Sequence, residues 1–163
     1  MGAENQDIIK SPIKFDKKTR LPLWSGIREF QLKYDISIAK IGKFFDALKD
    51  GKVLATKCNQ CNRVYFPPQA HCPYCKSNNN EWIEVPEVGI LETFTIIKIK
   101  PKTFSHYEDY VLAIGNFGDN LKILSWLKIE DKTKIKIGMK IRLKVCKRVP
   151  ENYYIYEFVP EEE

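Results

Sequence analysis

The sequence CNQCNRVYFPPQAHCPYC, residues 58–75, holds four of the five cysteines of the chain as two C-x-x-C pairs. The residues NRVYFPPQAH separate the pairs and allow two short turns, here called knuckles, to fold together as a hairpin. Where thiols stay reduced, one tetrahedral ion held by four thiolates explains two such pairs better than disulfides or a redox pair do. The ligands that the sequence predicts are Cys58, Cys61, Cys72 and Cys75.

Four sulfur ligands fill the coordination sphere of Zn²⁺, whereas a catalytic zinc usually has three protein ligands and an open position for water. We therefore expect a structural zinc that folds a small ribbon and takes no part in chemistry. Iron remains an alternative, because a rubredoxin site uses the same ligands. His71 is expected on the surface of the second knuckle, and Cys146, far away in the sequence, is expected outside the metal site.

The composition is that of an ordinary globular protein, with 163 residues of which 44% are hydrophobic and 29% charged. No apolar run approaches the length of about 18 residues that spans a bilayer. Residues 1–20 are polar and lack the apolar centre of a signal peptide. The sequence therefore predicts a cytoplasmic protein that does not enter a membrane, in agreement with reduced cysteines.

Two regions precede the ribbon. Residues 1–20 carry many charges without a period and are predicted to be a mobile tail. Residues 21–52 are predicted to be a helical lead-in, with a first helix capped by Ser25 and a second one whose apolar residues recur at helical spacing. The apolar residues of the second helix are Ile41, Phe44, Phe45 and Leu48. Such a face packs either on its own domain or on another protein, and the sequence leaves both open.

Strand-like segments follow the zinc ribbon, which is predicted to occupy residues 53–86. They are GILETFTIIKIK, YVLAIGNF, NLKILSWLKI, KIRLKVCKRV and YYIYEFV. Their spacing is typical of short antiparallel strands, so we predict a five-stranded barrel of the OB type over residues 87–159 and an acidic tail at residues 160–163. The predicted fold class is α+β and mainly β, with N-terminal helices, a rubredoxin-like zinc ribbon and a C-terminal OB-fold barrel.

The charge of the predicted barrel is uneven. Residues 88–150 hold 13 Lys and Arg against 6 Asp and Glu. A basic surface of this kind suits an anionic partner. Lysine on edge strands also protects a sheet against pairing with other chains, and the sequence does not separate the two interpretations.

A longer motif runs from the ribbon into the barrel. It consists of a C-x-x-C knuckle, a basic residue, an aromatic, Phe-Pro-Pro, a C-P-x-C knuckle, a Glu-Trp pair and a Gly. Its residues are Cys58, Cys61, Arg63, Tyr65, Phe66, Pro67, Pro68, Cys72, Cys75, Glu81, Trp82 and Gly89. Together with a Phe-Phe pair and a Leu-x-x-Gly-Lys exit upstream, this run resembles the acyl-CoA-associated zinc-ribbon and OB-fold proteins, also known as domain-of-unknown-function family thirty-five. The resemblance covers about residues 21–158.

The chain departs from the family pattern in three places. The family favours Gly after each knuckle, where the backbone often needs a positive φ, and this chain has Asn62 and Lys76. Asparagine tolerates that conformation better than lysine does. Gln69 stands where an arginine is frequent, which puts an anion contact from that position in doubt.

The resemblance implies a function without catalysis. Family members accompany thiolases, 3-hydroxy-3-methylglutaryl-CoA synthases or hydratase-like domains as accessory or bridging subunits and help to accommodate acyl-CoA. We therefore expect such an enzyme and acyl-CoA as partners. The candidates for contact with acyl-CoA lie on and after the first barrel strand and in the loop that follows it. They are Lys98, Lys100, Lys102, Tyr107 and Tyr110.

Two other functions compete with this interpretation. Zinc ribbons and basic OB barrels also bind RNA or single-stranded DNA, with exposed aromatics stacking on bases. The Phe-Pro-Pro ribbon and the helical lead-in favour the accessory subunit, because nucleic-acid binding explains neither. An independent enzyme fits poorly: the sequence has two histidines, and Ser105 beside His106 is not a triad.

Overall fold

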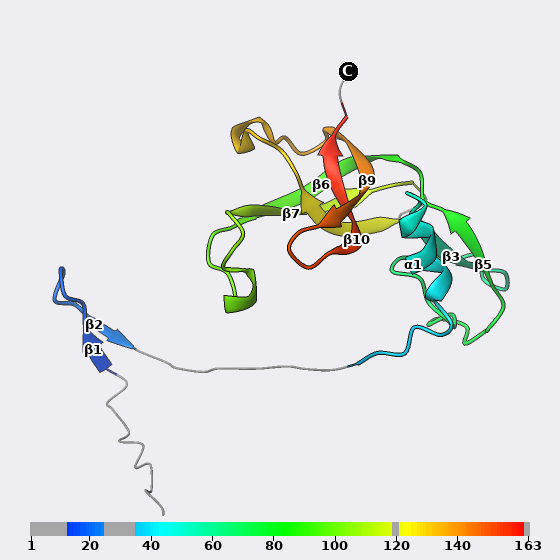
Figure 1. The fold of residues 1–163 in the computed structure, drawn as a ribbon, viewed down its shortest axis with the longest axis horizontal. Coiled ribbons are helices and arrows are strands. Elements are labelled where there is room, and N and C mark those ends of the chain that lie inside the picture. The colour runs from blue at the N-terminus through cyan, green and yellow to red at the C-terminus, as the bar shows by residue number, and fades with distance from the viewer. Residues whose placement is uncertain (1–12, 25–34, 119–120, 162–163) are drawn as a thin grey trace, which may run out of the picture. The chain divides into compact units, whose positions relative to one another are not determined.

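The computed structural model of this chain describes residues 13–24, 35–118 and 121–161. The chain divides into two compact units, residues 1–36 and residues 37–163. The described part of the first unit is an antiparallel hairpin of β1 (Ile13–Phe15) and β2 (Pro22–Trp24). The second unit contains a helix, a three-stranded sheet and a barrel (Figure 1).

The helix and the small sheet come first in the second unit. Helix α1 (Gly42–Lys49) is followed by three antiparallel strands in the order β4-β3-β5. These strands are β3 (Leu54–Cys58), β4 (Val64–Tyr65) and β5 (Asn80–Glu84). Both knuckles lie in the connections of this sheet, so β3, β4 and β5 form the frame of the zinc ribbon.

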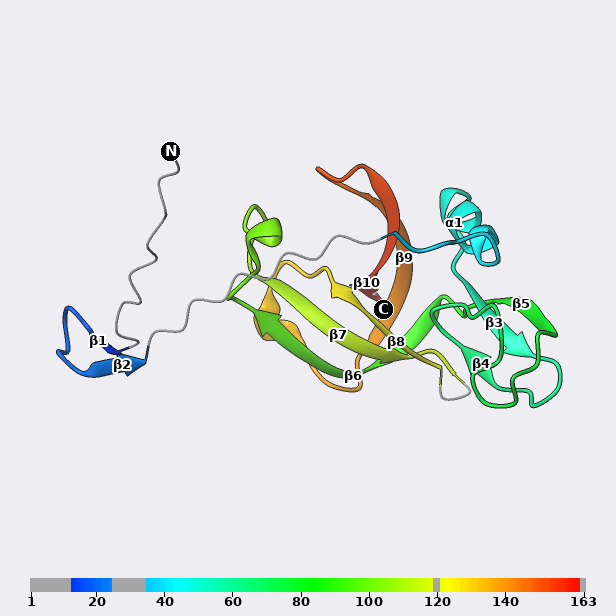
Figure 2. The same cartoon turned by 90° about the horizontal axis from the view of Figure 1, so that it is seen from below.

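Five further strands close into a barrel in the order β10-β8-β7-β6-β9 (Figure 2). They are β6 (Val88–Ile97), β7 (Tyr110–Asn116), β8 (Lys122–Leu127), β9 (Lys140–Arg148) and β10 (Tyr153–Pro160). Short 3₁₀ helices, η1 (Lys102–Phe104) and η2 (Lys132–Lys134), lie in two of the connections. Each strand begins within two residues of the start of the predicted segment and ends within three residues of its end, and the closed five-stranded barrel is confirmed.

The barrel interior is filled by apolar side chains around two stacked rings. Phe117 and Phe158 are buried, and their ring centres are 5.5 Å apart. Gly89 lets two strands approach closely here, because a Cβ atom at this position would lie 2.6 Å from the Asn116 carbonyl oxygen and 2.8 Å from the Phe117 ring. The glycine that ends the sequence motif therefore has a packing role.

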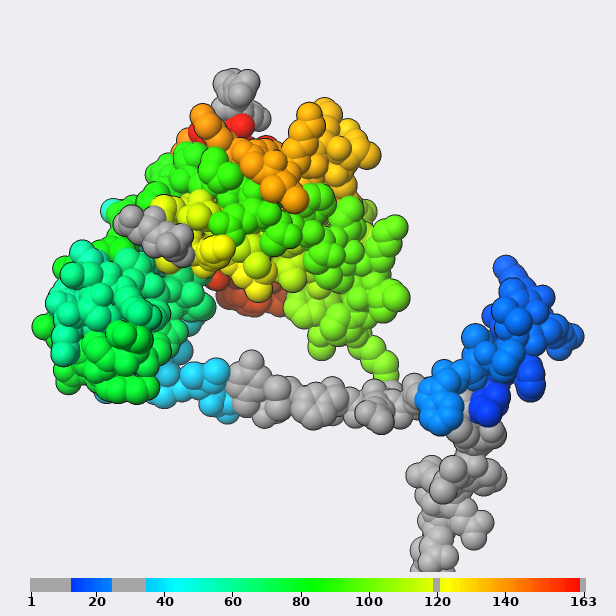
Figure 3. Space-filling view, turned by 180° about the vertical axis from the view of Figure 1, so that it is seen from behind, coloured from blue at the N-terminus to red at the C-terminus, as the bar shows by residue number. Residues whose placement is uncertain are grey.

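Three aromatic rings join the helix, the ribbon and the barrel. Phe44 of α1 lies 5.9 Å from Phe66 of the ribbon and 6.3 Å from Tyr156 of β10, and Phe66 and Tyr156 are 5.1 Å apart. In the space-filling view the ribbon forms a lobe beside the barrel (Figure 3). Phe44 is buried, so the helix packs on its own unit, while Phe45 is 39% exposed.

The N-terminal region differs from the prediction in part. The first predicted helix, from Ser25, falls on residues outside the described ranges. The sequence predicted a mobile tail over residues 1–20 and a helical lead-in over residues 21–52, and the hairpin of β1 and β2 crosses the boundary between them. Strands of three residues are too short to show an alternating pattern, so the sequence did not reveal this hairpin. In the described parts of the chain, no helix has the length and apolar character needed to cross a membrane.

Candidate functional site

The four predicted metal ligands lie together in the ribbon. The sulfur atoms of Cys58 and Cys75 are 3.5 Å apart, those of Cys61 and Cys72 are 3.6 Å apart, and all four lie within 4.8 Å of one another. Four thiolates in a tetrahedron around zinc, at Zn–S distances of about 2.3 Å, have their sulfurs about 3.8 Å apart. The donor set and its spacing therefore fit Zn²⁺, and these distances are far too long for disulfide bonds, at about 2.05 Å.

The two knuckles repeat one hydrogen-bond pattern. In the first, the Cys58 amide donates to the Arg63 carbonyl, and the Asn62 amide donates to the Cys58 carbonyl. In the second, Cys72 stands in the same relation to the fourth and fifth residues after it. Asn62 (φ 58°) and Lys76 (φ 63°) occupy equivalent left-handed positions, as the family pattern implied for these places.

The burial of the sulfurs also follows the knuckle pattern. The first cysteine of each pair, Cys58 or Cys72, is buried, and the second is half-buried. Tyr65 lies over the site, with its hydroxyl 3.2 Å from the Cys72 sulfur. This contact is the largest cause that raises the pKa of Tyr65 to about 12, so the hydroxyl remains a donor at neutral pH.

The Cys72 thiol has a lowered pKa even without a bound metal. Burial by itself would raise its pKa, but the Tyr65 hydroxyl and the amides of Cys75 and Tyr74 lower the pKa of Cys72 to about 6. A thiolate is the form that binds metal. The sequence motif contained Tyr65 as an aromatic, but did not reveal that its hydroxyl contacts a ligand.

Two side-chain contacts lie on the outside of the ribbon. The Arg63 guanidinium stacks on the Tyr74 ring at 3.5 Å from its centre and so connects the two knuckles. His71 is exposed, and its Nε2 lies 3.0 Å from the Lys40 amino group. Among the described residues His71 is not part of the candidate ligand group, as predicted. Trp82 of β5 is half-buried against the common apolar core.

Two of the five predicted acyl-CoA residues line one hollow of the barrel. Tyr107 and Tyr110 line a hollow of about 530 Å³, together with Asp109. Lys100, with its side chain mostly buried, makes an ion pair with Asp109 at 2.7 Å. The pKa of Asp109 is lowered first by this hydrogen bond and also by the charge of Lys98. The three lysines do not line the hollow, although two of them lie near its rim.

Aromatic side chains hold the loops of this barrel end together. Tyr110 stacks on Trp126 at 4.1 Å, and the Arg148 guanidinium lies 4.0 Å from the centre of the same ring. Trp126 is therefore in contact with two stacked groups, Tyr110 and Arg148. Tyr107 donates a hydrogen bond to Glu151 in the turn between β9 and β10.

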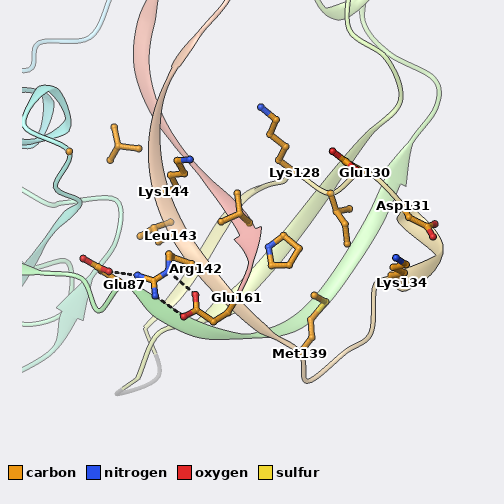
Figure 4. Close-up of a pocket in the computed structure, with 15 residues that line it drawn as sticks. Glu87, Lys128, Glu130, Asp131, Lys134, Met139, Arg142, Leu143, Lys144 and Glu161 are labelled. Carbon is orange, nitrogen blue, oxygen red and sulfur yellow. Dashed lines mark hydrogen bonds and ion pairs between the residues drawn. The ribbon is translucent and has the colours of Figure 1, made fainter. Parts of the chain in front are cut away.

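A second hollow lies beside β9 and the end of β10, with a volume of about 1150 Å³ (Figure 4). Arg142 makes a bidentate ion pair with Glu161, at 2.6 and 2.7 Å, and also pairs with Glu87. The other charged residues of the lining are Lys128, Lys134 and Lys144 against Glu130 and Asp131, and the rest of the lining is apolar. A surface with such balanced charge has no preference for an anion.

The fold and the four-sulfur site define the class of this protein: a rubredoxin-like zinc ribbon joined to an OB-fold barrel. The family model described as "ChsH2, rubredoxin-like zinc ribbon domain" matches residues 45–81, and the one described as "ChsH2, C-terminal OB-fold domain" matches residues 82–145. Together they match more than half of the chain, which belongs to this family. The metal of the four-cysteine site is accordingly a structural zinc.

Relatives of known name agree with this assignment. A DUF35 domain-containing scaffold protein of Methanocaldococcus jannaschii is 27% identical over 117 residues, which are 68% of this chain and 82% of the relative. A protein of the same name from Pyrococcus furiosus is 28% identical over 100 residues, which are 61% and 72% of the two chains. A probable enoyl-CoA hydratase alpha subunit of Thermomonospora curvata is 25% identical over 108 residues, 66% of this chain but 34% of the relative.

Two solved structures share the fold. A chain of the Ltp2-ChsH2(DUF35) aldolase superposes with a TM-score of 0.65 at 23% identity, covering 78% of this chain and 98% of that one. A DUF35-family protein from Sulfolobus solfataricus gives a TM-score of 0.52 at 19% identity, covering 76% and 86%. At these identities the likeness shows the ribbon-and-barrel architecture.

Proposed function

We propose that this chain is a non-catalytic accessory subunit that binds a thiolase or 3-hydroxy-3-methylglutaryl-CoA synthase type enzyme and accommodates its acyl-CoA. The observation that carries the proposal is the metal centre, whose four ligands are all sulfur and leave no coordination position for a substrate. A folded ribbon of this kind gives a rigid surface for another protein.

The other nucleophilic side chains also argue against independent catalysis. Cys146 is the one cysteine outside the zinc site, and burial is the main cause that raises its pKa to about 11. A thiol with this pKa is protonated at neutral pH and is a poor nucleophile. His106 lies 3.7 Å from Glu151, at the barrel end where aromatic side chains hold the loops together. His71 lies next to Lys40.

The names of the relatives support an enzyme as the partner. Two archaeal relatives are called scaffold proteins, a third is a probable subunit of an enoyl-CoA hydratase, and a structural neighbour is part of an aldolase. Hydratase chemistry acts on a coenzyme A thioester, so these names are in keeping with an acyl-CoA enzyme. The identity of that enzyme as a thiolase or synthase is our inference from the resemblance of the motif.

The hollow beside Tyr107 and Tyr110 is our candidate for the acyl-CoA contact. Its aromatic walls suit the pantetheine arm, and Lys98 and Lys100 near its rim suit the phosphates. Lys102, in η1 of the same connection, is the third candidate cation. Lys100 is already paired with Asp109, so we expect it to contribute less than Lys98.

Nucleic-acid binding is the alternative, and the aromatic cluster speaks against it. An OB fold binds single strands on one face of its sheet and between the connections of its first two and last two strands. Here these two connections contact each other through Tyr107 and Glu151, and Trp126 already stacks with Tyr110 and Arg148. A base therefore competes with these groups for the Trp126 ring.

Co-expression with the thiolases and the synthase of the same organism tests the proposal. We expect one of these enzymes to elute with the chain in a stable complex in size-exclusion chromatography. Titration calorimetry of that complex with acetyl-CoA should show heat that Tyr110→Ala reduces, while Lys122→Ala, at the far end of the barrel strands, serves as the control.

The outcome that contradicts the proposal is a chain that binds none of these enzymes and instead binds a short single-stranded RNA tightly. Such binding should weaken steeply between low and moderate salt, because each phosphate contact releases counterions. That result would establish the nucleic-acid function.

A further inference from the structure

The four sulfur atoms of the ribbon do not have the same hydrogen-bond donors. The two knuckles repeat one backbone pattern, and in the second knuckle the Cys75 amide donates to the Cys72 sulfur at 3.4 Å. The Tyr65 hydroxyl, 3.2 Å from the same sulfur, comes in addition to this pattern. Within the described ranges, Cys72 is the one ligand that a side-chain hydroxyl contacts. Cys72 therefore has a donor for which the repeat of the knuckles does not account.

The equivalent position in the other half of the ribbon is used differently. Tyr65 is the seventh residue after Cys58, and the seventh residue after Cys72 is Asn79. Asn79 instead binds Asn59: its side-chain oxygen accepts from the Asn59 side-chain amide at 3.0 Å, and its carbonyl accepts from the Asn59 backbone amide at 3.0 Å. The two halves share their backbone pattern, so the Tyr65 hydroxyl is a specific addition at one ligand.

The position of the Tyr65 ring is set by the fold. Its backbone lies in β4, where it pairs with Thr56 of β3. The next residue, Phe66, packs against Phe44 and Tyr156 and so holds the end of this strand. A hydroxyl that is held in this way loses little further conformational freedom when it donates to a sulfur, so the contact is preorganised.

The chemistry of a zinc thiolate decides which group donates. A metal-bound cysteine has lost its proton, so in the contact between Tyr65 and Cys72 only the phenol hydroxyl can be the donor. Four thiolates, each with one negative charge, outweigh the two positive charges of Zn²⁺, and the Cys58 and Cys72 sulfurs of this site are buried. Buried negative charge is costly unless donors compensate it. The hydroxyl therefore favours the metal-bound form.

We propose that Tyr65 is a positioning residue of the metal site: its hydroxyl donates to the Cys72 sulfur in the zinc-bound chain, orients that ligand and slows the loss of the metal. Groups that hydrogen-bond to metal ligands from outside the coordination sphere have this effect in other metal sites. The inference does not rest on the proposed accessory function, because it concerns how the ribbon keeps its ion and holds for any partner.

The test compares the full chain with Tyr65→Phe, which removes the hydroxyl and keeps the ring and its packing. Tyr74→Phe is the matched control, because it removes a hydroxyl from an exposed ring of the same ribbon that stacks on Arg63. Competition with a chelator measures the dissociation constant of zinc. We expect Tyr65→Phe to raise this constant at least about tenfold and Tyr74→Phe to change it less than about threefold. Thermal unfolding of the barrel should be the same in both variants.

Replacement of zinc by Co²⁺ distinguishes a hydrogen bond to sulfur from packing of the ring. The charge-transfer band of a cobalt thiolate site starts from the sulfur lone pairs, and a hydrogen bond lowers the energy of those electrons. Loss of the bond should therefore move the band of Tyr65→Phe to longer wavelength. The band of Tyr74→Phe should coincide with that of the unchanged chain.

An unchanged band in Tyr65→Phe would overturn the proposal even if zinc binds more weakly, because the ring would then act through packing alone. Equal zinc affinity of Tyr65→Phe and Tyr74→Phe would also overturn it. Either result leaves the accessory function intact, since that function is tested by formation of the complex with the enzyme.

Discussion

The largest fully buried side chains of the described residues are of two kinds, and they divide between the ribbon and the barrel. In the barrel they are Phe117, Phe158, Leu91, Ile123, Ile141 and Val111. In the ribbon they are two metal ligands, Cys58 and Cys72. The barrel is therefore stabilised by burial of apolar area, whereas the ribbon depends on an ion for the centre that it has too few residues to build.

This difference bears on function. A module held by a fully coordinated ion keeps its surface in one conformation without a large core, and the three-ring contact of Phe44, Phe66 and Tyr156 fixes that module on the barrel. An accessory subunit needs such fixed surfaces, because the partner enzyme supplies the chemistry. Substitutions in the ribbon, in the three-ring contact and in the barrel test this difference.

Removal of one zinc ligand should have the largest effect. Structural zinc contributes on the order of 10–16 kcal/mol in isolated finger peptides, so Cys72→Ser should abolish stable metal binding and unfold the ribbon. Elemental analysis should give about one zinc per chain for the unchanged protein and for the control Cys146→Ser. A full zinc content in Cys72→Ser would show that the ligand set is wrong.

Loss of the Phe44 ring, which lies between the ribbon and the barrel, should have the second-largest effect. Phe44→Ala removes a buried ring between the ribbon and β10, and we expect a loss of about 3–5 kcal/mol in the free energy of unfolding. Phe45→Ala is the matched control on the same helix, and its exposed ring should cost less than about 1 kcal/mol. Chemical denaturation measures both, and similar losses for the two variants would mean that α1 does not pack as described.

An added methyl group inside the barrel tests whether the barrel depends on the packing of its apolar core. Gly89→Ala would place a Cβ atom against the Asn116 carbonyl and the Phe117 ring, and such overpacking typically costs about 1–3 kcal/mol. Gly42→Ala is the control, since a Cβ atom there meets nothing within 4 Å. Thermal unfolding should fall for Gly89→Ala while zinc content stays at one per chain.

The smallest expected effect is an improvement of the second knuckle. Lys76 occupies a left-handed conformation that costs a non-glycine residue roughly 1–2 kcal/mol, so Lys76→Gly should stabilise the ribbon by less than about 1 kcal/mol after the greater freedom of the unfolded glycine is counted. Asn62→Gly at the equivalent position should change stability less, because asparagine tolerates this conformation. The rate of zinc transfer to a chelator measures both, and faster transfer from Lys76→Gly would contradict the strain.

Sequence reasoning succeeded where a regular pattern extends over many residues. Cysteine spacing identified the ligands, because the chain geometry of a C-x-x-C knuckle nearly fixes the positions of its sulfurs. Alternation identified strands such as β9, in which Ile141 and Leu143 are buried and Lys144 is exposed. Helix α1 followed from its apolar stripe, and the exposure of Phe45 shows that one position of a stripe can differ from its neighbours.

The remaining features depend on contacts between residues that no local pattern connects. The hairpin of β1 and β2 has strands of three residues, which carry no readable period. The hydrogen bond from Tyr65 to Cys72 depends on how one knuckle lies over the other. Nothing in the sequence indicated that Lys100 is paired. The loop after it folds back and places Asp109 in an ion pair with Lys100.

Amide hydrogen exchange of the full chain, with and without a zinc chelator, tests most directly whether the ribbon and the barrel obtain their order from different sources. We predict that metal removal accelerates exchange in β3, β4 and β5 and in the two knuckles, while β6 to β10 keep their protection. Restoring zinc should restore the slow exchange of the ribbon. Loss of protection throughout the barrel, or unchanged protection of the ribbon without metal, would contradict the account.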